Sequence, residues 1–323
     1  MSELFADLVG QRQARTLLTA ALRSQRLAPA YLLAGPEGVG RRLTALRFLE
    51  GVLAGPDGSP LQRRRLAAGN HPDLLWVEPT YLDKGELVPR SQAEERGLTR
   101  RSPPQLRLDQ IREVSRFLAR RPVEAPGCLV VLESAEAMAE AAANALLKTL
   151  EEPGQGLLLL ISAAPQQLLT TIRSRCQLVP FTRLEPADLA RVLSRVGAPA
   201  EPSTDPPELL ELAAGSPGAL LEHRRQWQGL PAGLAERLQT LPPEDPLAAL
   251  SLARDLTESL DAEQQLWLLA WWQVWLWRRL MRPALLQRLE QLRSQLLAFV
   301  QPRLAWEVAL LDLAALQTAD LLA

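Results

Sequence analysis

The sequence of 323 residues is poor in cysteine and in lysine. Its two cysteines, Cys128 and Cys176, exclude a four-cysteine zinc site and give no basis for a disulfide framework. Lys84 and Lys148 are its two lysines, and every other basic residue apart from histidine is an arginine. This scarcity limits which phosphate-binding motifs the chain can contain, because the common phosphate loop depends on a lysine.

The sequence also has no long apolar run and almost no net charge. The nearest approach to a membrane span, Gln264–Trp277, is shorter than the roughly 20 residues that a spanning helix needs. Residues Met1–Leu17 show no secretion signal, so we expect a cytoplasmic protein without membrane contacts. The 36 basic and 37 acidic residues leave a net charge of -1, so any contact with nucleic acid requires a local patch.

Short apolar runs alternate with helical patterns in the first half of the chain. Buried strands are predicted at Ala30–Ala34, Leu74–Val77, Cys128–Leu132, Gly156–Ile161 and Gln177–Phe181. Strands that are apolar throughout and alternate with helices indicate a parallel sheet covered on both faces. The rest of residues 54–105 lacks periodicity, and we expect mostly loop there, including a long excursion at Glu78–Pro104.

The second half of the chain is predicted to be all helix from Pro186 onward. Breaks are expected at Pro199–Pro207, Gly215–Gly218 and Pro242–Pro246. The length suits two or three domains, and we place the boundaries near residues 183 and 223.

A glycine-rich turn follows the first predicted strand and opens a helix. Gly35, Gly38 and Gly40 keep the glycine frame of the phosphate loop, whose working pattern is G-x-x-x-x-G-K-[ST]. Arg41 replaces the lysine and Arg42 replaces the hydroxyl residue that binds magnesium. Arginine has a different reach from lysine and cannot ligate a cation. Two interpretations stay open: a loop that cradles ATP or ADP weakly, and a glycine turn kept for packing.

An ATPase of this type also needs an acidic residue at the end of a second strand, where it holds magnesium. Ser134 occupies that position here, and Glu133 and Glu136 are displaced from it. The chain has thus lost both metal-holding elements of one site. We therefore expect no hydrolysis by this chain and no metal site of its own.

An arginine motif, Ser174-Arg175-Cys176, follows the strand at Gly156–Ile161 and a short helix. This position is at the edge of the predicted domain, away from its own phosphate loop. An arginine on such a rim can enter a neighbour's active site and stabilise the phosphoryl group in transfer. The alternative is an ordinary surface arginine in an arginine-rich protein.

The stretch Ala141–Pro153 (AAANALLKTLEEP) resembles the signature of bacterial clamp-loader subunits, and the motif around Arg175 resembles their trans-acting arginine. Three further segments are similar to the same family, so the resemblance covers nearly the whole chain: Phe5–Gln11, His71–Asp73 and Val300–Leu313. It implies an α/β AAA+ fold with a RecA-like parallel sheet over residues 1–183. A small helical lid over 184–222 and an all-α collar for oligomerisation over 223–323 would follow.

The altered phosphate loop places the chain closest to the delta-prime branch of this family. That resemblance implies a subunit that lends Arg175, flanked by Ser174 and Cys176, to a gamma- or tau-type motor subunit. The other implied partners are a clamp-opening delta subunit, the sliding clamp and primed DNA, and magnesium belongs to the neighbour. Many members carry a four-cysteine zinc module, but the matching segment Gly51–Asn70 has no cysteine, so we expect no zinc. The excursion at Glu78–Pro104 is longer than in the better-known members, and its role is open.

Two further patterns have competing interpretations. Arginines at positions 112, 116, 120 and 121 form a basic stripe, for which phosphate contact and a helix face paired to Asp109 and Glu113 weigh equally. Trp267, Trp271 and Trp275 share a helix face, where a buried helix contact is favoured over a platform for stacking bases. An active ATPase with an arginine-based loop and a DNA-binding scaffold outside replication remain the alternative functions.

Overall fold

A computed structural model describes residues 3–93, 95–98, 103–152, 154–198, 205–240, 245–298 and 300–321. The chain divides into two compact units. The first unit comprises Met1–Leu98, Ser102–Ala200 and Gly215–Gly218, and the second comprises Thr99–Arg101, Glu201–Ala214 and Ala219–Ala323. The division into three domains with boundaries near residues 183 and 223 stays a prediction.

The first unit is built on a five-stranded parallel sheet in the order β2-β5-β6-β1-β7. Its strands are β1 (Ala30–Ala34), β2 (Leu74–Val77), β5 (Leu129–Leu132), β6 (Leu157–Ser162) and β7 (Gln177–Pro180). Every predicted strand is present, with bounds within one residue of the expected ones. The predicted parallel sheet is therefore confirmed.

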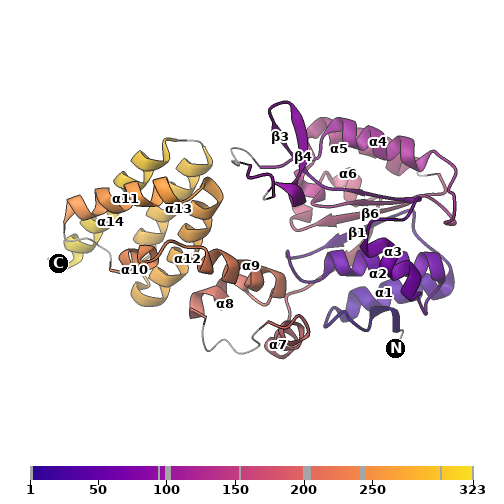
Figure 1. The fold of residues 1–323 in the computed structure, drawn as a ribbon, viewed down its shortest axis with the longest axis horizontal. Helices are drawn as coiled ribbons and strands as arrows, with labels where there is room; N and C mark the ends of the chain where they lie inside the picture. Colours follow the sequence, from indigo (N-terminus) through magenta and orange to yellow (C-terminus); the bar gives the residue numbers. More distant parts are fainter. Residues whose placement is uncertain are drawn as a thin grey trace. The chain divides into compact units, whose positions relative to one another are not determined.

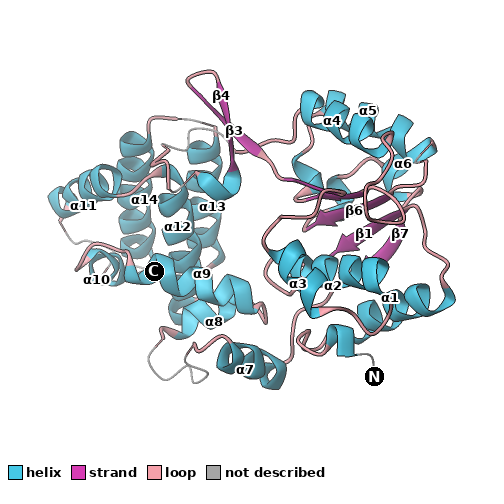
Figure 2. Ribbon diagram, turned by 45° about the vertical axis from the view of Figure 1, so that its right-hand side comes forward, coloured by secondary structure: helices cyan, strands magenta, loops and turns pink. Residues whose placement is uncertain are grey.

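Helices cover both faces of this sheet (Figures 1 and 2). One face carries α1 (Arg12–Ser24), α2 (Arg41–Ala54) and α3 (Pro60–Ala67), and the other carries α4 (Leu108–Leu118), α5 (Glu140–Glu151) and α6 (Thr170–Arg173). Single turns of 3-10 helix lie at Glu3–Phe5, Ala135–Ala137 and Pro165–Gln167.

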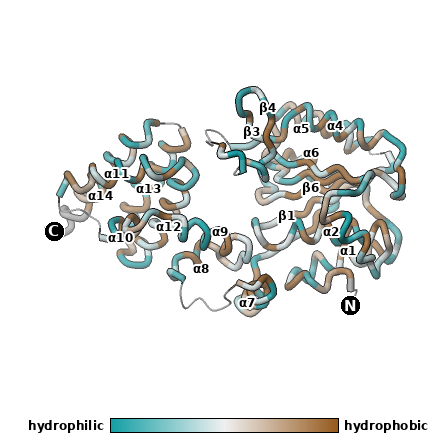
Figure 3. The backbone as a smooth tube through the Cα atoms, in the orientation of Figure 1, coloured by the Kyte–Doolittle hydropathy of each residue, from teal (hydrophilic) through white to brown (hydrophobic). Residues whose placement is uncertain are grey.

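Alternate side chains of each central strand enter different cores. In β1, Tyr31 and Leu33 join the core under α1 and α2, whereas Leu32 joins the core under α4 and α5. Because successive side chains point to opposite faces, a strand covered on both faces must be apolar at every position. The hydrophobic colouring of the sheet in Figure 3 follows from this requirement.

The prediction that residues 54–105 are mostly loop is wrong at helix α3. Pro60 occupies its first turn, where a proline costs nothing because that backbone N–H has no helical partner. The buried carboxylate of Glu50 accepts hydrogen bonds from the Ser59 backbone N–H and from Arg63 Nε, both at 2.9 Å. The helix thus depends on a tertiary contact that periodicity does not reveal.

The same prediction is wrong at the start of the Glu78–Pro104 excursion, where β3 (Thr80–Asp83) and β4 (Glu86–Pro89) form an antiparallel hairpin. Lys84 and Gly85 make its two-residue turn, with φ values of 46° and 89°. Positive φ at both positions is the geometry that tight hairpins favour. A turn of 3-10 helix, Arg90–Gln92, follows, and Thr80 also pairs with Gln105.

The described residues from Pro186 onward are mainly helical, as predicted. The expected breaks at Pro199–Pro207 and Pro242–Pro246 lie partly outside the described residues, and a helix begins at Pro217, inside the expected break at Gly215–Gly218. Helix α7 (Pro186–Arg195) belongs to the first unit. It is followed by α8 (Pro207–Ala213), α9 (Pro217–Gln228), α10 (Leu234–Gln239), α11 (Pro246–Ser259), α12 (Ala262–Leu280), α13 (Pro283–Leu297) and α14 (Pro302–Leu321). Within the described residues, none of the helices combines the length and the apolar content that crossing a bilayer would take.

Tryptophans of α12 and α14 form the interior of the second unit. Trp271, Trp272 and Trp306 are fully buried. Trp272 Nε1 donates to the Leu238 carbonyl at 3.1 Å, and Trp306 Nε1 donates to Gln265 Oε1 at 3.0 Å. Of the three tryptophans in the predicted face, Trp271 and Trp275 are buried, and Trp267 is half-buried with its Nε1 donating to His223 Nδ1 at 3.0 Å. The favoured interpretation, a buried helix contact, therefore holds for Trp271 and Trp275.

Candidate functional site

The candidate site begins at the glycine-rich turn between β1 and α2. A Cβ atom at Gly35 would lie 2.3 Å from the Phe181 carbonyl oxygen, so no larger residue fits there. Gly40 has a φ of 99° at the N-terminal cap of α2, a conformation that side chains rarely adopt. Packing and backbone geometry therefore account for these glycines without a ligand.

Contacts distant in sequence hold this loop in place. Ser216 Oγ donates to the Glu37 carbonyl at 2.6 Å, and the Gly218 N–H donates to the Gly38 carbonyl at 3.1 Å. The buried Gln11 side chain donates to the Val39 carbonyl at 3.3 Å. These contacts from distant protein groups thus help to fix the loop's shape. Sequence reasoning missed these contacts, because nothing local links Gln11 or Ser216 to the loop.

Arg41, the residue at the lysine position, points into the protein. It is 7% exposed, and its Nη1 atom is buried with no hydrogen-bond partner among the described residues. Burial lowers the pKa of this guanidinium, while nearby Glu136, Glu37 and Glu133 act to raise it. Three of the protein's own carboxylates therefore act electrostatically on this arginine.

Arg42, at the position of the magnesium-binding hydroxyl, forms an ion pair across the site. Its Nη1 atom lies 3.1 Å from Glu133 Oε2, and its guanidinium lies 4.7 Å from the centre of the Trp76 ring. Trp76 Nε1 donates to the same carboxylate oxygen at 2.9 Å. The guanidinium of Arg42 thus occupies the place of a metal ligand, and the carboxylate of Glu133 is already paired with it. These residues do not fit a magnesium ion.

Ser134 and Glu136 complete the region where an ATPase holds its metal. Ser134 has a φ of 50° and precedes the 3-10 turn at Ala135–Ala137. Glu136 Oε1 accepts the Ala163 N–H at 3.0 Å, which ties it to the end of β6. In the described part of the chain, no group of three or more histidine, cysteine or acidic side chains is arranged to hold a metal ion.

Arg175 lies just beyond the end of α6, with its side chain 37% exposed. Its Nη2 atom is 2.9 Å from Glu151 Oε1, and its Nη1 atom donates to the Thr171 carbonyl at 3.1 Å. The structure therefore brings the arginine motif together with the end of the stretch Ala141–Pro153. Sequence reasoning named both motifs but did not identify Glu151 as the partner of Arg175.

The neighbours of Arg175 in its motif have supporting contacts. Ser174 Oγ donates to the Thr171 carbonyl at 3.1 Å. Cys176 packs against the core under α4 and α5, and burial raises the pKa of its thiol to about 11. Ser174 and Cys176 thus anchor the segment that presents Arg175.

His71-Pro72-Asp73 has a structural task in this chain. The buried carboxylate of Asp73 accepts the backbone N–H groups of Val123, Glu124 and Ala125 at 2.7–2.8 Å. This contact fastens the loop between α4 and β5 to the start of β2.

The predicted basic stripe lies only partly on α4, because the helix ends at Leu118 and Arg120 and Arg121 follow it. Several of its arginines are engaged within the protein. Arg112 Nη1 lies 2.9 Å from Asp109 Oδ1, and Arg116 Nε donates to the Arg112 carbonyl at 3.4 Å. Arg120 donates to the Pro72 carbonyl and lies 3.7 Å from the centre of the Phe117 ring. The ion pair of Arg112 with Asp109 supports the paired helix face for that residue.

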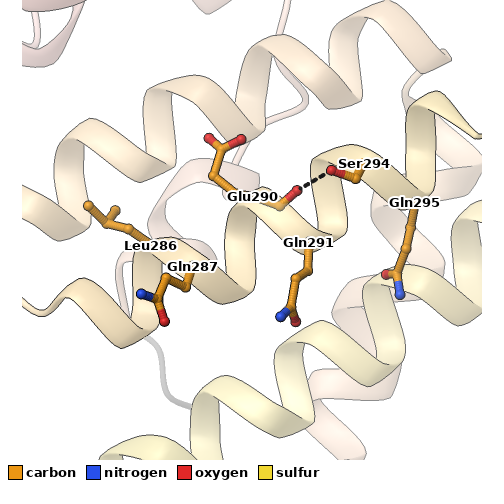
Figure 4. Close-up of a pocket in the computed structure, with 6 residues that line it drawn as sticks. All are labelled: Leu286, Gln287, Glu290, Gln291, Ser294 and Gln295. Atoms are coloured by element: carbon orange, nitrogen blue, oxygen red, sulfur yellow. Dashed lines mark hydrogen bonds between the residues drawn. The ribbon is translucent and has the colours of Figure 1, made fainter.

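A separate hollow of about 660 Å³ lies along α13 in the second unit. Figure 4 shows that its lining side chains all come from successive turns of that helix, and that Ser294 Oγ donates to the Glu290 carbonyl. The lining consists of one leucine, one serine, one glutamate and three glutamines. It contains no nucleophile–base pair.

The sheet order, the loop between β1 and α2 and the helical second unit define an AAA+ type of subunit. A family described as "DNA polymerase III, delta subunit" matches residues 10–185, and one described as "Cyanobacterial DNA polymerase III delta prime, C-terminal domain" matches residues 187–313. The chain belongs to the DNA polymerase III delta-prime subunit family.

Similar proteins agree with this assignment. DNA polymerase III subunit delta' of Pseudomonas aeruginosa is 38% identical over 63% of this chain and 57% of that relative. The Bacillus subtilis protein of the same name is 33% identical over 54% of this chain and 49% of its own length. The matches thus span about half the length of these relatives.

A solved structure supports the fold. It is a DNA polymerase III gamma subunit-related protein of Thermotoga maritima, with a TM-score of 0.53 and 19% identity, and the match covers 94% of this chain and 99% of that one. This similarity concerns the arrangement of the elements only.

Proposed function

We propose that this chain is a delta-prime-type subunit of a bacterial DNA polymerase III clamp loader and does not hydrolyse ATP itself. It lends Arg175 to the ATP site of a neighbouring gamma- or tau-type motor subunit. The other partners are a clamp-opening delta subunit, the sliding clamp and primed DNA, which the assembly holds. Its own loop binds ATP or ADP weakly or not at all, and it binds neither magnesium nor zinc.

One observation carries the proposal: the ion pair between Arg42 and Glu133. A phosphate-loop ATPase needs a hydroxyl and a carboxylate that share a magnesium ion with the nucleotide. Here a guanidinium replaces the hydroxyl and neutralises the adjacent carboxylate. Binding magnesium at this position would require breaking the pair and would place two cations side by side.

Arg175 has the exposure and the contacts that the proposed transfer needs. Its guanidinium is held by Glu151 and the Thr171 carbonyl in this chain, but more than a third of the side chain faces solvent. On entering a neighbour's site, it would exchange one carboxylate oxygen for phosphate oxygens, which guanidinium binds through paired, charge-assisted hydrogen bonds. Stabilising the phosphoryl group in this way can raise the rate of transfer roughly 10³- to 10⁵-fold.

Reconstitution with motor, delta and clamp subunits tests this role. We expect Arg175→Ala to assemble normally and to lose most ATP turnover at the one site that it serves, by roughly 10³-fold or more at that site. Arg173→Ala is the matched control, because Arg173 is an exposed arginine at the end of the short helix that precedes Arg175. The measurements are complex formation by size-exclusion chromatography and clamp-stimulated ATP hydrolysis.

Equal turnover for Arg175→Ala and Arg173→Ala would refute the finger role. The rival function, an active ATPase with an arginine-based loop, makes a different prediction. In that case the purified chain alone would hydrolyse magnesium-ATP, and Gly40→Asp would abolish the activity.

A further inference from the structure

Helix α1 carries a row of arginines that the proposed function does not use. Its inner face buries Ala14, Leu18 and Leu22 in the core of the first unit. The side away from this core carries the exposed Arg12 and Arg23, and the half-buried Arg15 lies at its edge. The short side chains of Thr16, Thr19 and Ala20 lie between them. Long basic side chains therefore flank a shallow centre.

This face forms one wall of a groove of about 780 Å³. The other wall is α7, through Asp188 and Arg191, and both helices belong to the same compact unit. The groove is lined by Phe5, Gly10, Arg12, Arg15, Thr16, Thr19, Ala20, Arg23, Asp188 and Arg191.

The groove carries a positive charge that the chain does not neutralise. Its one lining carboxylate, Asp188, is paired with Arg191 at 2.6 Å. Arg12, Arg15 and Arg23 form no salt bridge with any residue that the structure describes. By contrast, Arg112 and Arg120 of the α4 stripe are held by Asp109 and by the Pro72 carbonyl.

We propose that this groove binds the sugar–phosphate backbone of duplex DNA, as a contact additional to DNA held through the assembly. Guanidinium and hydroxyl groups are the side-chain donors that contact backbone phosphates most often. The single aromatic residue of the lining, Phe5, is 1% exposed, so the groove offers no platform on which unpaired bases could stack. An arginine cluster can also bind an acidic peptide, but a peptide seated here would find no apolar anchor pocket for its side chains. The lining provides only small, polar and charged groups at its surface.

Fluorescence anisotropy with the full chain and a labelled duplex of about 20 base pairs tests the proposal. Neutralising three phosphates gives a slope of roughly -2.7 for the logarithm of the binding constant against the logarithm of the salt concentration. The affinity should therefore fall about 40-fold between 50 and 200 mM salt. The triple variant Arg12→Ala, Arg15→Ala, Arg23→Ala should lose this binding and its salt dependence.

Two further triple variants make the result interpretable. Replacing the same three residues by lysine should keep most of the affinity, because the charges remain. Replacing Arg112 and Arg116 of α4 and Arg121 just beyond it by alanine removes the same charge elsewhere and should leave binding unchanged. Circular dichroism of each variant checks its folding.

Three results would overturn the proposal. One is unchanged duplex affinity in the α1 alanine variant. Another is loss of binding in the α4 variant alone. The third is tighter binding of a polyglutamate peptide or of single-stranded DNA than of the duplex. This proposal is tested independently of the role of Arg175, because the α1 alanine variant should still support Arg175-dependent ATP turnover.

Discussion

Asp73 shows how much one side chain can contribute to the stability of the folded protein. Its buried carboxylate accepts three backbone N–H groups of the loop between α4 and β5. Asp73→Asn replaces one accepting oxygen by a donor, and we expect the free energy of unfolding to fall by about 1–3 kcal/mol. Urea denaturation measures this, with the exposed Asp57→Asn as the control; equal stability of the two variants would contradict it.

The shifted pKa of Asp73 predicts that the stability of the protein depends on pH. Burial alone would raise the pKa of Asp73, but the three backbone donors outweigh it and the pKa is lowered. A carboxyl whose pKa is lower in the folded state stabilises the protein above its unfolded pKa, near 4, and this contribution is lost as the pH falls through the folded value. Between pH 7 and pH 3, Asp73→Asn should therefore lose less stability than the wild type.

Cys176 supplies a chemical test at the residue scale. Burial raises the pKa of its thiol to about 11, so little thiolate is present near neutral pH. In a Cys128→Ser background, alkylation of Cys176 by iodoacetamide at pH 8 should be roughly 100-fold slower than that of free cysteine. Modification as fast as that of the free amino acid would show that the anchoring contact is absent in solution.

At the scale of elements, sequence patterns predict the strands well and the short helix α3 badly. A strand covered on both faces is apolar at each position, so β1, β2, β5, β6 and β7 could be located within one residue. Helix α3 and the β3–β4 hairpin have no comparable pattern, because a buried glutamate and a two-residue turn stabilise them. The glycine frame and Arg175 could be found from motifs. The contacts of Gln11, Ser216 and Glu151 join segments that only the fold brings together.

Glu50 is the residue that should decide whether α3 forms. Besides its bonds to Ser59 and Arg63, its carboxylate lies 3.6 Å from Arg47 Nη1. Glu50→Gln removes the charge from a buried ion-pair cluster, and we expect a loss of about 3 kcal/mol with fraying of α3. Hydrogen exchange of the α3 amides and urea denaturation measure both effects. The exposed Glu140→Gln is the control, and unchanged protection of α3 would contradict the prediction.

At the scale of the whole molecule, the internal ties of the phosphate loop predict that folding does not depend on nucleotide. Because a ligand stabilises a protein only by binding its folded state, 1 mM magnesium-ATP should shift the melting temperature of the wild type by less than about 1 °C. Arg41→Lys with Arg42→Thr restores the working motif and releases Glu133, and this variant should show a larger shift. A shift of several degrees in the wild type would overturn the prediction.

The positions of the tryptophans determine which part of this protein intrinsic fluorescence can monitor. Seven of the eight lie at Trp227 or beyond, whereas Trp76 stands alone in the first unit and covers the Arg42–Glu133 pair. Intrinsic tryptophan fluorescence will therefore follow the unfolding of the helical second unit. It will contain almost no signal from the phosphate loop. A single fluorinated indole at position 76, observed by NMR, would give that loop a signal of its own.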